Sequence, residues 1–148
     1  MEQANSYIFA HLMGGLGKQL FQYAAGLLQK KITNGMLLLE KATDNTHDTN
    51  DYRKILFNQG YAYDAGIPNH VSLYQDDAFK PWNPEDYKFP TLYMYGFFQH
   101  YPSLEPILPE FKENILQQLQ VRKQGMKTKY IIPPNSGFIH IRRGDYVE

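Results

Sequence analysis

Apolar residues near the start of the chain are spaced first as in a strand, then as in a helix, and then as in a second strand. Residues 7–13 form an apolar and aromatic run of strand length, and residues 36–40 form another. Between them, apolar residues recur every three or four positions, which predicts a helix with one buried stripe and with Gln22 and Gln29 outside it. This order of elements is a βαβ unit, so we predict an α/β protein.

The middle of the chain is less regular. Residues 41–51 are polar, as in a surface loop, and residues 51–57 suit one short helix. Residues 58–90 have no clear period but contain four prolines and many aromatic residues, which indicates loops. Aromatic side chains in such loops either form a small local core or stack on the faces of sugar rings. They include Tyr61, Tyr63, Tyr74, Phe79, Trp82 and Tyr87.

The last third of the chain predicts a strand, a helix and another strand. Residues 91–98 are apolar and aromatic, and a helix is expected from about Ser103 or Leu108 to Gln120. Its expected buried side consists of Leu108, Phe111, Ile115, Leu116 and Leu119. Residues 122–135 carry four basic residues and no acidic one, and we interpret them as a linker whose charges are either solvated or attract an anionic ligand. Residues 137–141 then predict a short buried strand.

The composition is that of an ordinary globular protein, with 43% hydrophobic and 20% charged residues over 148 positions. Fifteen Lys and Arg balance fifteen Asp and Glu, so we expect no binding to nucleic acid. The absence of cysteine excludes disulfides, thiolate zinc sites and cysteine nucleophiles. Residues 1–5 lack the basic start of a signal peptide, and no apolar run is as long as a bilayer span. We therefore expect a cytoplasmic protein without a transmembrane segment, with peripheral membrane association as the other option.

Two arginines, Arg142 and Arg143, follow the last predicted strand. Because side chains alternate along a strand, His140 and Arg142 share one face. Adjacent arginines at the carboxyl end of a strand need an anionic partner, and the guanidinium fork suits a diphosphate, with Asp145 ordering one arginine. The alternative is a structural ion pair with Asp145 or another carboxylate. Arg143, Gly144 and Asp145 also match a cell-adhesion tripeptide, which would have to be exposed.

A glycine-rich loop, residues 14–17, joins the first predicted strand to the helix. Glycine lets a ligand approach the backbone closely, and the free N–H groups at a helix start attract phosphate. A Walker A loop is excluded because Leu12 and Gln19 stand where it needs a glycine and a serine or threonine. A dinucleotide fingerprint is excluded because Leu20 stands in place of its third glycine. The loop is therefore either a phosphate site of another kind or only a tight turn.

Three segments together resemble the α-1,2-fucosyltransferases of glycosyltransferase family 11. Residues 140–147, HIRRGDYV, are similar to the HxRRGDY motif of that family. Residues 14–24, GGLGKQLFQYA, resemble its GGLGNQxFQYA signature, and residues 96–99, GFFQ, followed by Tyr101, resemble its G[YF][WF]Q segment. The order and separation of the segments also suit the family. Lys18 is a departure, because the family usually has asparagine there.

The resemblance implies a GT-B-type glycosyltransferase with two Rossmann-like domains, of which this chain corresponds to the first half. Residues 1–121 would form the Rossmann-like acceptor-side domain, residues 122–136 a linker, and residues 137–148 the first strand and HxRRGDY motif of the donor-binding domain. We expect the rest of the donor domain either in a continuation of the polypeptide or in a second chain. The alternative is a relative without catalysis that serves as a glycan-binding module or as a subunit.

The activity implied by the resemblance is transfer of L-fucose from GDP-β-L-fucose to the 2-hydroxyl of a terminal galactose, with inversion and without a metal or another cofactor. The partners would be GDP-fucose and a galactose-terminated glycan. Arg142 is the expected catalytic residue at the diphosphate. The expected donor-binding residues are His140, Arg142, Arg143, Asp145, Gly14, Gly15, Gly17 and Gln19. The general base stays open, since spacing does not distinguish among His11, Asp64, Asp76, Asp77 and His100.

Overall fold

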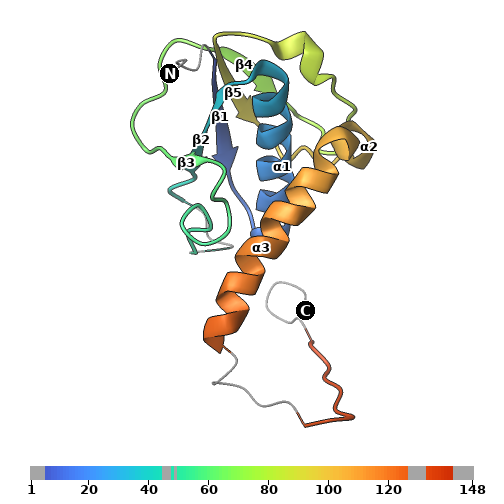
Figure 1. Ribbon diagram of the computed structural model, residues 1–148. Helices are drawn as coiled ribbons and strands as arrows, with labels where there is room; N and C mark the ends of the chain where they lie inside the picture. The colour runs from blue at the N-terminus through green and yellow to red at the C-terminus, as the bar shows by residue number, and fades with distance from the viewer. Residues whose placement is uncertain (1–5, 45–47, 49, 127–132, 142–148) are drawn as a thin grey trace.

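The computed structural model describes residues 6–44, 48, 50–126 and 133–141, without the side chains of 124–126. Figure 1 shows a sheet with helices packed against it. The elements, in chain order, are β1 (Tyr7–Leu12), α1 (Leu16–Thr33), β2 (Met36–Lys41), β3 (Tyr61–Ala62), β4 (Val71–Tyr74), η1 (Pro84–Tyr87), β5 (Thr91–Tyr95), α2 (Tyr101–Leu104), η2 (Glu105–Ile107) and α3 (Leu108–Met126).

The five strands form one sheet in the order β3-β2-β1-β5-β4, and every neighbouring pair is parallel. β1 is the central strand: Ile8 lies opposite Leu37 of β2 on one side and Leu92 of β5 on the other. The βαβ start and the α/β class expected from the sequence are confirmed. The arrangement is compatible with a Rossmann-like domain, in which ligands bind at the carboxyl ends of the strands.

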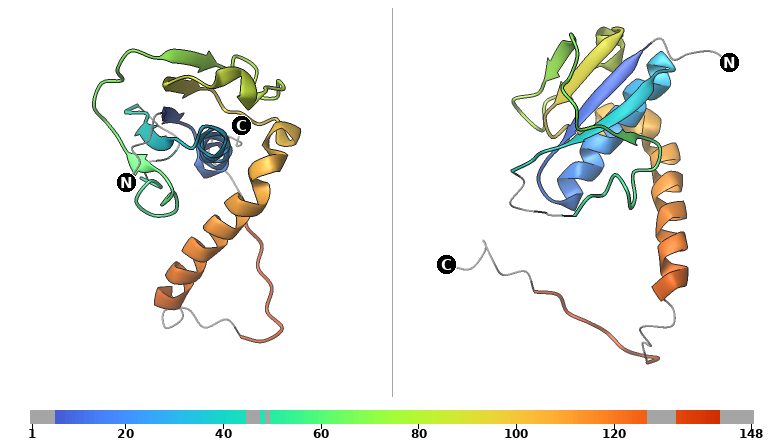
Figure 2. Two further views of the ribbon diagram at one scale, coloured as in Figure 1. Left: turned by 45° about the horizontal axis from the view of Figure 1, so that its top comes forward. Right: turned by 90° about the vertical axis from the view of Figure 1, so that its left-hand side faces the viewer.

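One face of the sheet, which we call the helix face, is buried by helices. α1 packs on β1 and β2, and α2 and α3 pack against α1 on the same side of the sheet (Figure 2). Seven side chains on this face are at most 2% exposed: Ile8, Ala10, Leu12, Leu37, Leu39, Leu92 and Met94. They occupy alternate positions along their strands, so their side chains all point to the helix face and form the core there.

The opposite face, which we call the open face, carries aromatic and polar side chains. They are Phe9, His11, Glu40, Tyr74, Tyr93 and Tyr95. Among the described residues it is covered by the β3–β4 connection and by no helix (Figure 2). From that connection Tyr63 packs edge-on against Phe9 at 5.1 Å between ring centroids, and His70 packs against Tyr93 at 5.3 Å.

A buried polar network joins α1 to α3. The hydroxyl of Tyr23 donates to Oδ1 of Asn114 at 2.6 Å and accepts from the N–H of Gln59 at 3.2 Å. The Tyr23 ring stacks on Phe57 with 4.4 Å between centroids. Burial raises the pKa of Tyr23 to about 12, which keeps its hydroxyl protonated as a donor. The network fixes α3 against the middle of α1.

Several predicted elements differ from the observed ones. Residues 51–57 form successive turns, not a helix, because Arg53 is held by Asp51 and Asp64 on either side of it in sequence. The prediction missed β3 and β4, which have only two and four residues and so show no period. β5 ends at Tyr95, since the positive φ angles at Gly96 (155°) and Phe98 (52°) cannot continue a strand.

α3 is longer and less buried than expected. It continues to Met126, so residues 122–126 are helical, whereas the helix was expected to end near Gln120. Leu116 and Leu119, which were expected on the buried side, are 57% and 46% exposed. The second half of α3 extends beyond the end of the sheet (Figure 1), and among the described residues too little packs there to bury these two leucines.

The buried strand expected over residues 137–141 is not formed. These residues make no strand, and Phe138, Ile139 and Ile141 are 93%, 89% and 74% exposed. The segment lies apart from the sheet (Figure 2), and a strand forms only where a neighbour supplies its hydrogen bonds. The division of the chain at 121 and 136 stays a prediction.

Candidate functional site

The glycine loop lies at the carboxyl end of the central strand, where α1 begins. Gly15 is the N-cap of α1, no side chain caps the helix, and its first turn has no acidic residue. A Cβ atom added to Gly15 or Gly17 would meet no atom within 4 Å. The start of α1 therefore has no capping side chain and has open space beside Gly15 and Gly17, and the positive end of a helix dipole in such a setting can bind an anion.

Gly14 has a different role from the other two glycines. Its φ of 82° lies in the left-handed region, and a Cβ there would stand 2.8 Å from Cδ of Lys18. Gly14 therefore shapes the turn between β1 and α1, whereas Gly15 and Gly17 leave room above it. The sequence prediction of a ligand-approachable backbone is consistent with this geometry at Gly15 and Gly17.

Two buried glutamines of α1 make hydrogen bonds to the backbone at the glycine loop. Gln19 is 1% exposed and its Nε2 donates to the carbonyl of Gly14 at 2.9 Å. Gln22 is 2% exposed, accepts from the N–H of Met13 at 3.0 Å and donates to the carbonyl of Gly96 at 3.2 Å. Gln19, which the sequence placed among the donor-binding residues, thus faces the loop backbone and positions it. The helical period put Gln22 outside the buried stripe, so sequence reasoning missed its role.

Lys18 brings a positive charge to the loop. Its Nζ lies 4.7 Å from the ring centroid of Phe97, within the range of a cation–π contact. Phe97 follows Gly96, to which Gln22 is bonded. The structure therefore brings two of the three resembling segments together, residues 14–24 and 96–99, although they are far apart in sequence.

The third resembling segment is mostly outside the described residues. His140 is exposed and in no strand or helix. Arg142, Arg143 and Asp145 lie outside the described residues, so their contact with a diphosphate, with each other or with an adhesion receptor stays a prediction.

A second polar group lies on the open face, near the same end of the sheet. Nδ1 of His11 and Oε1 of Glu40 are 2.5 Å apart, and the hydroxyl of Tyr93 donates to the same oxygen at 2.8 Å. The His11 and Glu40 side chains are 15% and 21% exposed. Burial and the hydrogen bond to Glu40 raise the pKa of Tyr93 well above its usual range, so Tyr93 stays a donor.

Aromatic rings continue from this pair toward the sheet edge. The His11 ring stacks on Tyr95 with 4.8 Å between centroids, and Tyr95 stacks on Tyr74 at 5.7 Å. Tyr74 is 64% exposed. Sequence reasoning included His11 among the base candidates and Tyr74 among the aromatic residues of the loops, but it missed Glu40, Tyr93 and Tyr95, because their meeting depends on strand register.

The other base candidates serve local structure. Asp64 pairs with Arg53, with Oδ1 2.6 Å from Nη1, and the hydrogen bond from Arg53 lowers the pKa of Asp64. Nδ1 of His100 caps α2 by accepting from the N–H of Ser103 at 3.3 Å. Asp76 and Asp77 accept hydrogen bonds from backbone N–H groups one and two residues further along.

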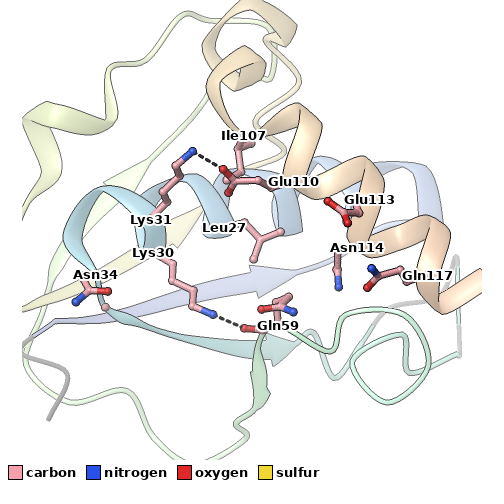
Figure 3. Close-up of a pocket in the computed structure, with 11 residues that line it drawn as sticks. Leu27, Lys30, Lys31, Asn34, Gln59, Ile107, Glu110, Glu113, Asn114 and Gln117 are labelled. Atoms are coloured by element: carbon pink, nitrogen blue, oxygen red, sulfur yellow. Dashed lines mark hydrogen bonds and ion pairs between the residues drawn. The ribbon is translucent and has the colours of Figure 1, made fainter. Parts of the chain in front are cut away.

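A groove of about 370 Å³ lies between the second half of α1 and α3 (Figure 3). Its cations are bonded within the protein: Nζ of Lys31 lies 2.5 Å from Oε1 of Glu110, and Nζ of Lys30 donates to the carbonyl of Gln59 at 3.0 Å. The groove is at the opposite end of α1 from the glycine loop. We interpret it as a gap between packed helices.

Comparison of the chain with protein-family models, with curated proteins and with solved structures found no match. In the described part of the chain, no group of three or more His, Asp or Glu side chains is placed to hold a metal ion. None of the described helices is long and apolar enough to cross a membrane.

Proposed function

We propose that this chain is the acceptor-side domain of a GT-B-type α-1,2-fucosyltransferase, which transfers L-fucose from GDP-β-L-fucose to the 2-hydroxyl of a terminal galactose. The observation that carries the proposal is the glycine loop at the carboxyl end of β1. It leaves the start of α1 uncapped and approachable at Gly15 and Gly17, with Lys18 beside it. The same loop is the segment with the longest resemblance to the family.

The chemistry needs positive charge where the diphosphate leaves. As the bond from fucose C1 to the diphosphate breaks, negative charge grows on the β-phosphate, and fixed N–H groups and cations stabilise it. The backbone at Gly15 and Gly17, together with Lys18, supplies such groups from the described residues. Arg142 would supply the main cation, with His140, Arg143 and Asp145 completing the donor site.

The exposed apolar residues of 137–141 support a second domain. Phe138, Ile139 and Ile141 are more exposed than is usual for such side chains, and the pattern is that of a strand. In the proposed enzyme they pack into the sheet of the donor domain, which the same polypeptide or a second chain supplies.

The alternative function is a glycan-binding module or subunit without catalysis. The observation that favours it is a set of exposed aromatic side chains, with Tyr61, Tyr74 and Phe79 between 63% and 69% exposed. Rings of this kind can stack on sugars whether or not a donor binds.

Calorimetric titration with GDP-fucose tests the proposal, with GDP-mannose as the competing ligand. We expect GDP-fucose to bind more tightly, and we expect Arg142→Ala to lose binding. Lys18→Ala should weaken binding about tenfold, the typical effect of one charge-assisted hydrogen bond to an anion. Lys112→Ala is the matched control, because Lys112 is an exposed lysine on α3. A folded protein that gives no heat with GDP-fucose would favour the glycan-binding alternative.

A further inference from the structure

We propose that the His11–Glu40 pair on the open face binds the reacting hydroxyl of the acceptor, with Nε2 of His11 as the atom that receives its proton. This inference rests on the proposed function and adds to it the acceptor site and the general base. Three observations carry it: the way the imidazole is held, its distance from the glycine loop, and the aromatic rings beside it.

The imidazole of His11 is held in one orientation. A carboxylate can only accept a hydrogen bond, so Nδ1 carries the hydrogen that lies between His11 and Glu40. Nε2 then has a free lone pair, and it makes no hydrogen bond to the described residues. Glu40 is itself fixed by the second hydrogen bond, from Tyr93. A histidine oriented by a carboxylate, with its other nitrogen available, is the usual arrangement of a general base.

The position of His11 along β1 suits the size of the donor. His11 precedes Gly14 by three residues, so the two lie within about 10 Å of each other. A diphosphate on the loop, the fucose C1, the acceptor oxygen and the base need a span of about this length when reacting atoms are about 3 Å apart. The 15% exposure of the His11 side chain leaves the ring partly accessible.

The neighbouring rings suit a sugar acceptor. Tyr95 and Tyr74 continue the stack from His11 toward the β4 edge, and Tyr74 is largely exposed. A galactose ring has one face of C–H groups, which packs on aromatic rings while its hydroxyls reach polar groups nearby. A galactose placed on Tyr74 would extend toward His11. The tyrosine rings and the base therefore form one continuous surface.

The step balances without any further reactant. The acceptor oxygen forms a bond to C1 of fucose as the bond from C1 to the diphosphate oxygen breaks. GDP leaves with the electron pair of that bond, and the hydroxyl proton moves to Nε2 of His11. The imidazolium that results is stabilised by the Glu40 carboxylate through Nδ1.

The first test needs no donor. The histidine ring signals are followed by NMR during titration with methyl β-galactoside and, separately, with its 2-deoxy analogue, and the His11 signal is assigned by its loss in His11→Gln. We expect the His11 signal to shift with the galactoside and to shift much less with the analogue. A His11 signal that stays in place, or that moves equally with both sugars, would overturn the proposal.

The second test measures fucose transfer to lactose by the complete enzyme, in which the donor domain is supplied by the same polypeptide or by a second chain. We expect His11→Gln to slow transfer about 100-fold or more, the usual contribution of a general base, with the affinity for GDP-fucose unchanged. His100→Asn is the matched control, since asparagine keeps a capping side chain at the start of α2, and it should transfer at the wild-type rate. Wild-type transfer by His11→Gln would contradict the assignment.

The two tests separate the two proposals. If GDP-fucose does not bind but the galactoside still shifts the His11 signal, the donor half of the proposed function fails and the acceptor site stands. If GDP-fucose binds and the His11 signal does not respond to galactoside, the acceptor assignment fails alone.

Discussion

The helix face and the open face belong to the same strands but carry different kinds of side chain. On the helix face Leu37, Leu39 and Met94 are at most 1% exposed, whereas on the open face Glu40 is 21% and Tyr74 64% exposed. Because side chains alternate along a strand, neighbouring residues such as Leu39 and Glu40 fall on opposite faces. One face can therefore provide the core while the other keeps polar groups near solvent. Changes to the first should alter stability, and changes to the second should alter ligand binding.

The largest expected effect is on the helix face. Leu39→Ala should lower the free energy of unfolding by about 3 kcal/mol, because Leu39 is fully buried in the core on the helix face. Tyr74→Ala on the open face should lower it by less than about 1 kcal/mol, because the ring is mostly exposed. Urea denaturation of both variants measures the contrast. Equal losses would show that the open face is also part of the core.

The next largest effect on stability is expected from Arg53, which lies near the carboxyl end of β2. The Arg53 side chain is 6% exposed and bonds Asp51, Asp64 and the carbonyl of Leu39. Arg53→Ala should cost about 2 kcal/mol, as expected for hydrogen bonds to a charged group. Lys54→Ala is the matched control and should have little effect, since Lys54 is 75% exposed and 4.0 Å from Asp51.

The effect of Arg53→Ala should depend on pH. Hydrogen bonds from Arg53 lower the pKa of Asp51 and of Asp64 below the usual 3.8. Their contribution is therefore fully present above that value and is lost as the pH falls through the lowered pKa. The difference in unfolding free energy between wild type and variant should be constant near neutral pH and shrink in acid. A difference that grows in acid would contradict these pairings.

The smallest effects compare one tyrosine from each side of the sheet. Tyr23→Phe and Tyr93→Phe each remove a hydroxyl that donates to a neighbour, Asn114 or Glu40, and each should cost about 1 kcal/mol near neutral pH. Burial, the largest cause in both, raises the pKa of Tyr23 to about 12 and the pKa of Tyr93 above its usual value.

Alkaline unfolding then reports on both hydroxyls. A raised pKa stabilises the fold below the unfolded-state value of 10.0, and that stabilisation is lost as the pH rises toward the folded-state value. The unfolding free energy of the wild type should therefore fall above pH 10.0, and that of each phenylalanine variant should fall less steeply. Variants as sensitive to alkali as wild type would mean that other groups cause the loss.

The sequence by itself determined the elements that follow from local pattern. The βαβ start was predictable because its apolar periods are long and Asn34 and Gly35 mark the turn, and the glycine loop because glycines lie between a strand and a helix. The strands β3 and β4 could not be predicted in this way, because they are too short to show a periodic pattern. The sequence also did not predict that Gln22 is buried. A polar side chain is buried there because it is bonded to Met13 and Gly96, and these contacts are made only in the folded structure.

The tertiary structure decided which side chains meet. His11, Glu40 and Tyr93 come from three strands, with Glu40 29 positions from His11 and 53 from Tyr93, and parallel register alone places them together. It also decided which apolar residues are buried. Leu116, Leu119 and residues 137–141 have the pattern of buried elements, yet they are exposed because burial requires a facing surface, which local pattern does not specify.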